Sequence, residues 1–330
     1  MADWIEHTKF IEIADDCSQQ QVAAADLWFS DTEIKQYQRL QAEVAARNQP
    51  GSWQPGQKLQ IVASDVVARH RLQGKMARLE RVVFCDQRRR LESRPRVQKP
   101  IFLVTYGPPG SGKGACLNAF LRKVRPPSGV DEADYFELNI DNIVAALDGG
   151  GGSGTIAIDA QNYDFFRPMA NRIVDDLREI GIKRGVHLIL ETTGDSVSAD
   201  WYRREVVDEA HKRNYYVVVV YPLSSVAELL RRVEVRVTSG ATRRRPADEF
   251  VRTAATRAAD NIATLIQIVD KTIVFDNSPD GEACHVEIIE CDRTACTVNW
   301  AWLSKQIAEK FGGLTLNLGS SGGTNPFLSH

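Results

Sequence analysis

The stretch TYGPPGSGKGACL, residues 105–117, follows directly on the apolar run IFLV and constrains the fold more than any other feature. Gly107, Gly112 and Lys113 fit the spacing G-x-x-x-x-G-K of loops that hold phosphate groups. A strand, a glycine-rich turn and a helix in this order direct backbone N–H groups and the positive helix end at one point. The stretch therefore predicts a strand, loop and helix that bind a nucleotide triphosphate.

The phosphate loop departs from the usual pattern at its last position. A Ser or Thr normally follows the lysine and ligates Mg²⁺, whereas Gly114 and then Ala115 stand here. We expect Lys113 to bridge the outer phosphates. The alternative is a simple turn between strand and helix that carries an incidental lysine. The residues predicted to bind the nucleotide are Gly107, Pro109, Gly110, Ser111, Gly112, Lys113, Gly114 and Ala115.

Beyond residue 100, short β-rich runs alternate with helical stretches. The runs are IFLVTYG, VHLILETTG, YYVVVVYPL and KTIVFDNS. Continuous apolar strands separated by helices are typical of a parallel sheet that is covered on both faces. The pattern, together with the phosphate loop, predicts an α/β protein with the P-loop NTPase fold.

Residues 1–98 follow a different pattern, in which apolar residues recur at steps of three and four with charged residues between them. We therefore expect a mainly helical N-terminal module. The segment SRPRVQKP, which ends at Pro100, is predicted to be a linker. The expected division is a helical module over 1–98, a kinase-like domain over 99–312 and a flexible tail over 313–330.

Composition sets limits on location and partners. The chain of 330 residues is 43% hydrophobic and 25% charged, and no apolar run approaches the ~20 residues that cross a membrane. Its acidic start and its scattered cysteines, none in a C-x-x-C pair, favour a reducing, cytoplasmic location. A net charge of −2 argues against general attraction to nucleic acid.

One local basic stretch is the exception. Residues 69–99 hold eleven Lys or Arg against three acids, so they could contact RNA or DNA. Arginine-rich helices more often face solvent or pair with neighbouring acids. A nucleic-acid partner is therefore not favoured.

Two acids follow predicted strands, where ligands bind in open α/β sheets. Asp141 comes after the short run YFELNI and could accept a proton from an attacking hydroxyl, although it could also cap the next helix. Glu191 ends a buried apolar strand, and a carboxylate there is costly without a metal or donors. We expect Glu191 near Mg²⁺ and the substrate.

Six arginines lie between residues 231 and 245, around a Ser-Gly turn. Guanidinium groups on a mobile segment can neutralise the charge of a migrating phosphoryl group. The cluster is either such a lid or a solvated face. The last predicted strand, KTIVFDNS, ends in polar residues that include Asn277.

The order of these motifs over roughly residues 100–280 resembles the zeta-toxin group of P-loop kinases, and the string GPPGSGKG also resembles the loop of adenylate kinases. The resemblance implies that Lys113 binds ATP, that Asp141 is the base and that Glu191 contacts substrate and metal. It implies lid arginines among Arg232, Arg236 and Arg244, and it places Asn277 near the adenine.

The sequence departs from that family where an arginine usually follows the catalytic Asp by three residues, because Val144 stands there. The family's best-known members phosphorylate UDP-N-acetylglucosamine, and this site differs where the substrate is recognised. We therefore expect an ATP- and Mg²⁺-dependent kinase that acts on a hydroxyl of a small molecule, with a UDP-sugar as one candidate. The alternatives are a nucleotide or polynucleotide-end kinase, and a nucleotide-binding switch without turnover.

Overall fold

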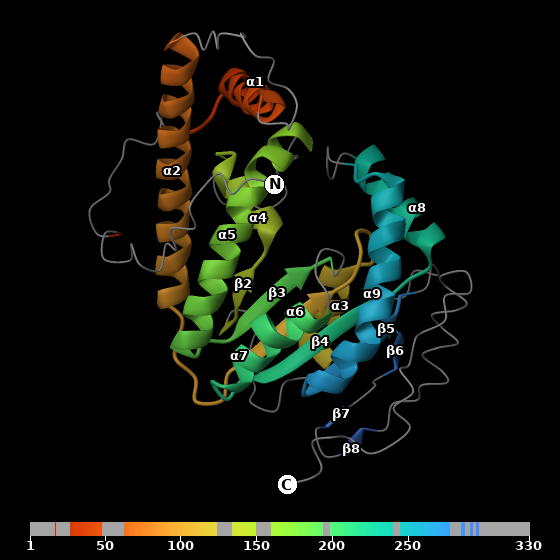
Figure 1. Ribbon diagram of the computed structural model, residues 1–330. Coiled ribbons are helices and arrows are strands. Elements are labelled where there is room, and N and C mark those ends of the chain that lie inside the picture. Colours follow the sequence, from red (N-terminus) through yellow and green to blue (C-terminus); the bar gives the residue numbers. More distant parts are fainter. Residues whose placement is uncertain are drawn as a thin grey trace. The chain divides into compact units, whose positions relative to one another are not determined.

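The computed structural model describes residues 17, 27–47, 63–123, 134–149, 160–193, 199–239, 245–277, 285–287, 291–292 and 295–296 (Figure 1). They form two compact units. The first contains the described residues up to Arg90 and the segment Ile140–Leu177. The second contains Leu91–Asn139 and the described residues from Arg178 onward.

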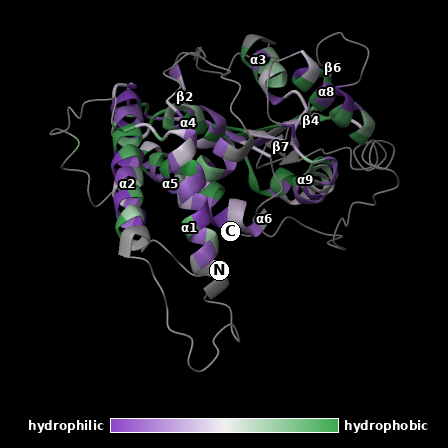
Figure 2. Ribbon diagram, turned by 90° about the horizontal axis from the view of Figure 1, so that it is seen from above, coloured by the Kyte–Doolittle hydropathy of each residue, from purple (hydrophilic) through white to green (hydrophobic). Residues whose placement is uncertain are grey.

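The first unit is helical. Its elements are α1 (Asp31–Arg47), α2 (Ala63–Glu92) as far as Arg90, α4 (Ile140–Leu147), and α5 (Ala160–Arg184) as far as Leu177. Ser30 and Glu33 cap α1 reciprocally, because each backbone N–H donates to the side chain of the other, at 3.0 and 3.3 Å. Purple and green residues alternate along α1 and α2 (Figure 2), as expected of helices that bury one face.

Polar and covalent links connect α2 to other parts of the first unit. Arg172 of α5 donates two hydrogen bonds to the buried Glu80 carboxylate, at 2.8 and 2.9 Å. Burial raises the pKa of Glu80 while the Arg172 guanidinium acts in the opposite direction. Cys17 and Cys85 form a disulfide across a separation of 68 residues.

The second unit is built on a sheet. Its elements are β1 (Ile101–Tyr106), α3 (Lys113–Lys123), β2 (Phe136–Leu138), β3 (Leu188–Thr192), α6 (Ala199–Trp201), the π-helical η4 (Tyr202–Asp208), α7 (Glu209–His211), β4 (Tyr216–Leu223), α8 (Val226–Thr238), α9 (Asp248–Ile268), β5 (Lys271–Asp276), β6 (His285–Glu287), β7 (Cys291–Asp292) and β8 (Ala295–Cys296).

The main sheet has the strand order β2-β3-β1-β4-β5-β6, in which β1 to β5 pair in parallel and β6 pairs antiparallel with β5. After β1 the chain adds β2 and β3 on one side of β1, and it then adds β4 and β5 on the other side. The carboxyl end of β1 therefore lies where the strand order reverses, the usual ligand site of open α/β sheets.

Helical segments cover both faces of this sheet. On one face, Cys116 and Phe120 of α3 pack in a buried cluster with Leu103, Val220 and Ile273 of the strands. Strand residues that are neighbours in sequence point to opposite faces. On the other face, Tyr106 of β1 packs on Tyr202 of η4, with ring centroids 5.5 Å apart. This arrangement confirms the predicted α/β P-loop fold.

Several sequence expectations have counterparts here. The long helices α1 and α2 occupy the stretch that was expected to be helical, and the linker over 93–100 is neither helix nor strand. Helix α9 and the antiparallel strand β6 were not predicted from the sequence. The domain limits at 98 and 312 stay predictions, and the tail over 313–330 lies outside the described residues. In the described part of the chain, no helix combines the length and apolarity that a membrane span requires.

Candidate nucleotide site

The predicted phosphate loop joins β1 to α3. Its backbone turns sharply at Gly110 and Gly112, which have φ of 81° and 85°. The Ser111 N–H donates to the Pro108 carbonyl at 3.2 Å, and the Cys116 N–H donates to the Gly112 carbonyl at 3.0 Å as α3 begins. The first amides of a helix have no acceptor inside it, so the start of α3 directs N–H donors into the loop.

The space around the glycines explains which of them the loop requires. A Cβ on Gly110 would lie 2.6 Å from the Leu229 carbonyl oxygen, and one on Gly112 would lie 2.4 Å from Asn277 Nδ2. Both residues also have positive φ, which L side chains adopt at a cost. Among the described residues, no atom lies within 4 Å of the Cβ position of Gly114. The missing hydroxyl at residue 114 is therefore not imposed by the packing.

Lys113, the first residue of α3, lies over the phosphate loop. Its Nζ donates to the Gly107 carbonyl at 3.1 Å and lies 3.5 Å from the Pro108 carbonyl. The same Nζ is 3.6 Å from Glu191 Oε1. The lysine side chain is only 10% exposed, which keeps its charge close to the loop. Lys113 is thus in the place where the sequence predicts a phosphate contact.

Glu191, near the end of β3, lies beside Lys113 and is partly exposed. Asn139, which directly follows β2, donates through Nδ2 to Glu191 Oε2 at 2.9 Å and to Glu137 Oε1 at 3.1 Å. One oxygen of Glu191 therefore lies near the lysine and the other accepts from the asparagine. The Gly107 N–H donates to the Thr192 carbonyl at 3.2 Å, which ties the loop to the end of β3.

Asp141 lies in the first turn of α4, in the first unit, and is exposed. The hydroxyl of the buried Tyr163 donates to Asp141 Oδ1 at 2.8 Å. One turn further along the helix, Val144 is completely buried, so the position that usually carries an arginine in the resembled family serves packing here. The structure thus pairs the predicted base with a tyrosine that the sequence did not indicate.

The predicted lid arginines have different surroundings. Arg236 is exposed in the last turn of α8. Arg244 lies outside the described residues. Arg245 forms ion pairs with Glu234 at 3.2 Å and Asp248 at 3.3 Å. Arg232 is held close to the phosphate loop by several hydrogen bonds, which are described below.

Asn277 follows β5 and contacts the phosphate loop directly. Its Nδ2 donates to the Ser111 carbonyl at 2.7 Å. The adenine contact of Asn277 stays a prediction, and the loop contact is an addition from the structure. Two further residues of the site, Asn139 and Tyr163, were not predicted from the sequence. The strand-end position of Asn139 could have indicated it, whereas Tyr163 stands 22 positions from its partner with no motif between them.

The loop has the donors that a triphosphate needs. The Ser111 hydroxyl is buried and has no hydrogen-bond partner among the described residues, so a ligand could supply one. Among the described residues, Lys113 contacts carbonyl groups and one carboxylate, which phosphate oxygens could replace. The described residues contain no group of three His, Cys, Asp or Glu that could hold a metal by itself. This is compatible with Mg²⁺, which often uses one carboxylate together with substrate phosphates.

Comparison with known proteins gives one family. A family model described as zeta toxin matches residues 86–285. No curated protein sequence matches the chain. The solved structures that match include one of the PezAT chromosomal toxin-antitoxin system of Streptococcus pneumoniae, with 13% identity and a TM-score of 0.48, over 72% of this chain and 87% of that one.

A second matching structure is AvrRxo1-ORF1:-ORF2 with ATP, with 16% identity and a TM-score of 0.49, over 73% of this chain and 76% of that one. Both TM-scores are below 0.5, and the family assignment therefore rests on the family model, together with the parallel sheet and the phosphate loop. The family model spans more than half of the chain. The chain therefore belongs to the zeta toxin family and has the fold of a P-loop kinase.

Proposed function

We propose that this protein transfers the γ-phosphoryl group of ATP to a hydroxyl group of a small molecule. The observation that carries the proposal is the position of Lys113, whose Nζ lies 3.1 Å from the Gly107 carbonyl of the loop and 3.6 Å from Glu191 Oε1. In-line phosphoryl transfer needs mainly positioning and charge neutralisation. A buried lysine at the loop and a carboxylate beside it support both requirements.

The residues have distinct proposed roles. The loop glycines with Pro109, Ser111 and Ala115 bind the phosphates, and Lys113 neutralises their charge. Asp141 accepts the proton of the attacking hydroxyl, and Tyr163 holds one of its carboxylate oxygens at 2.8 Å. Arg236 and Arg244 come from the arginine segment that we propose as a lid.

We propose Glu191 as the protein's contribution to a Mg²⁺ site. Mg²⁺, when bound, neutralises charge on the outer phosphates. Asn139 orients the Glu191 carboxylate by donating to Oε2. Since Gly114 and Ala115 provide no hydroxyl, the remaining metal ligands in this proposal are phosphate oxygens and water.

The acceptor is proposed at the level of its class. A nucleotide sugar such as a UDP-sugar is the first candidate, because the family resemblance implies it. The buried Val144 distinguishes this chain at the position where the resembled family carries an arginine. We further propose a cytoplasmic location, on the basis of the scattered cysteines, none of which stands in a C-x-x-C pair. Nucleic acid is not a favoured partner.

The test is Mg²⁺-dependent conversion of ATP to ADP, measured by chromatography with UDP-sugars, nucleosides or short oligonucleotides as acceptors. We expect one small-molecule class to raise turnover. Lys113→Ala and Asp141→Asn should each lower it by at least about 100-fold, the usual loss when a charge-stabilising group or a positioned base is removed. Asp148→Asn is the matched control, because Asp148 lies just after the same helix and pairs with Asn162.

Other outcomes would favour other functions. Stimulation by oligonucleotides alone, with a steep dependence on salt, would favour a polynucleotide-end kinase. ATP binding without turnover under every acceptor would favour a nucleotide switch. The missing hydroxyl at Gly114 would then be the first feature to examine.

A further inference from the structure

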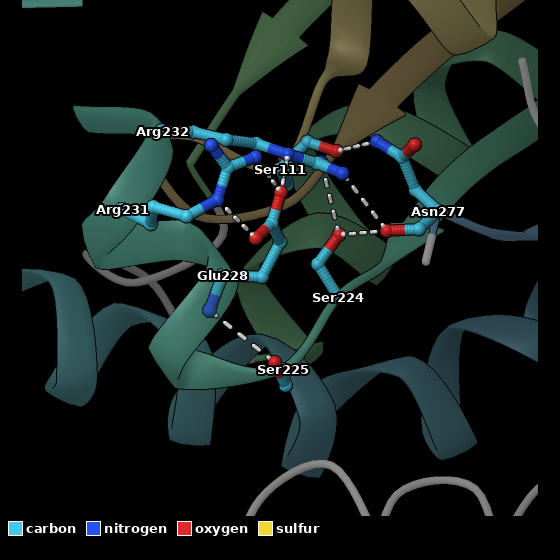
Figure 3. Close-up of polar contacts among 7 residues, drawn as sticks. All are labelled: Ser111, Ser224, Ser225, Glu228, Arg231, Arg232 and Asn277. Carbon is cyan, nitrogen blue, oxygen red and sulfur yellow. Dashed lines mark hydrogen bonds and ion pairs between the residues drawn. The ribbon is translucent and has the colours of Figure 1, made fainter. Parts of the chain in front are cut away.

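A hydrogen-bonded network connects the first turns of α8 to the back of the phosphate loop (Figure 3). It consists of Ser111, Ser224, Glu228, Arg232 and Asn277, and we call it the loop anchor. All of these residues lie in the second unit.

Arg232 is the centre of the loop anchor. Its Nε donates to Glu228 Oε1 at 2.6 Å, one terminal nitrogen donates to the Ser224 hydroxyl at 3.3 Å, and the other donates to the Asn277 carbonyl at 3.1 Å. A guanidinium with all three nitrogens bonded to protein groups is fixed in place. Arg232 is thus unlike the exposed Arg236, which is four residues further along α8.

Glu228 forms an ion pair with Arg232 within α8. Its carboxylate is 5% exposed and accepts from Arg231 at two positions, each 2.7 Å, as well as from Arg232. The hydrogen bond from Arg231, followed by that from Arg232, lowers the pKa of Glu228 against the effect of burial. The ionised Glu228 therefore keeps Arg232 directed toward Ser224 and Asn277.

Asn277 connects Arg232 and Ser224 to the phosphate loop. Its backbone carbonyl also accepts from the Ser224 hydroxyl at 3.0 Å, and its N–H donates to the Leu223 carbonyl at 3.0 Å. These bonds fix the residue, so its Nδ2 can hold the Ser111 carbonyl at 2.7 Å. The same Nδ2 occupies the space next to Gly112 that any side chain there would need.

From this geometry we propose that Arg232 and Asn277 are positioning residues, which hold the phosphate loop in its nucleotide-binding shape through the Ser111 carbonyl and do not contact the phosphates. The effect on nucleotide binding rests on the function proposed above. Arg232 acts through Asn277, and Asn277 acts through the Ser111 carbonyl. Arg232 is then not available to the proposed lid, whereas the exposed Arg236 of α8 is.

The loop itself provides the first test. Hydrogen exchange of the amides of residues 107–112, measured without nucleotide, should be faster in Arg232→Ala and Asn277→Ala than in the wild type. Arg231→Ala is the matched control, because Arg231 shares Glu228 but contacts neither Ser224 nor Asn277 in the drawn network. Exchange unchanged in both anchor variants would overturn the proposal, whether or not the protein binds ATP.

Nucleotide affinity provides the second test. Each anchor variant should raise the Kd for ATP by about ten-fold, the size of effect that the loss of one hydrogen bond can have. The double variant should lose no more than Asn277→Ala alone, because both residues act along one path. Additive losses would instead indicate that Arg232 contacts the nucleotide directly, and would overturn the positioning role.

The two proposals fail in different ways. Wild-type protein that binds no ATP would contradict the proposed function, and the exchange experiment would still decide on the loop anchor. Wild-type protein that binds ATP as tightly as Arg232→Ala and Asn277→Ala would contradict the anchor and leave the kinase proposal standing. Thermal unfolding of each variant separates a loosened loop from a destabilised protein.

Discussion

At the scale of single residues, the phosphate loop shows that glycines in one motif have different reasons to be glycine. Gly112 has φ of 85° and faces Asn277 Nδ2 at 2.4 Å from its Cβ position. Gly114 is exposed in α3, and nothing lies within 4 Å of its Cβ position. Substitution should therefore be costly at residue 112 and tolerated at residue 114.

We expect Gly112→Ala to abolish detectable ATP binding. Alanine would meet a conformational cost of about 1–2 kcal/mol at this φ and would displace the Asn277 amide from Ser111. Isothermal titration with ATP is the measurement. Tight binding by Gly112→Ala would show that the loop can adopt another shape.

We expect Gly114→Ser to fold normally and to bind ATP at a lower Mg²⁺ concentration than the wild type. The added hydroxyl would stand where related loops ligate the metal. Titration of ATP binding with Mg²⁺ measures the effect, and Gly114→Ala is the control for the loss of glycine alone. An equal response of the two variants would mean that the hydroxyl does not reach the metal.

At the scale of elements, the start of β1 depends on a side chain that directly precedes β3. The buried His187 accepts the Ile101 N–H at Nδ1, 2.9 Å away, so this nitrogen must be unprotonated. Burial lowers the pKa of His187 below its ordinary value of 6.5, and the negative charge of Asp134 opposes that shift. The Tyr135 ring lies 5.2 Å from the imidazole.

Because His187 must stay neutral in the folded state, we expect the second unit to lose stability as the pH falls below about 6.5. Above that value His187 is neutral in both states, and its contribution is complete. Below it the unfolded chain binds the proton first, so folding loses up to ~1.4 kcal/mol per pH unit until the lower folded pKa is reached. Urea unfolding between pH 5 and 8 should show this slope.

The matched variants for the pH experiment are His187→Asn and His70→Asn. Asparagine at 187 retains an acceptor but does not titrate. The free energy of unfolding should therefore fall less steeply between pH 6.5 and the pKa of His187 in the folded state. His70 is exposed on α2, and its replacement should leave the slope unchanged. A wild-type slope in His187→Asn would assign the effect to other groups.

At the scale of the whole molecule, the disulfide is at odds with the proposed cytoplasmic location. The Cys17–Cys85 bond links two residues of the first unit that are 68 positions apart in the sequence. Disulfides are rare in the reducing cytoplasm. The redox state of these two cysteines in the cell therefore bears directly on where the protein works.

We expect reduction to destabilise the first unit by up to about 4 kcal/mol, because the bond restricts the unfolded chain. Urea unfolding with and without dithiothreitol measures this loss. The Cys17→Ser/Cys85→Ser protein should show no response to the reductant. Trapping thiols at lysis then tells whether the bond forms in the cell, and an oxidised pair would contradict the cytoplasmic location.

The sequence by itself determined the parallel sheet, the phosphate loop and the position of Glu191 near the end of β3, whereas Asp141, expected at a strand end, lies in the first turn of α4. These features are local or periodic, because strand hydrophobicity and the spacing of Gly107, Gly112 and Lys113 lie within short stretches. The tertiary structure decided which side chains meet. Asn277 and Ser111 are 166 positions apart, and only the adjacency of strand ends brings the amide to the loop.

The same reason explains the arginines and the departures from the family pattern. Sequence could group the arginines but could not tell that Arg232 is bonded by Glu228, Ser224 and Asn277 while Arg236 is exposed. Nor could it tell that Val144 is buried and that the position at Gly114 is open. Burial and free space depend on neighbours from distant parts of the chain, and those neighbours exist only once the chain has folded.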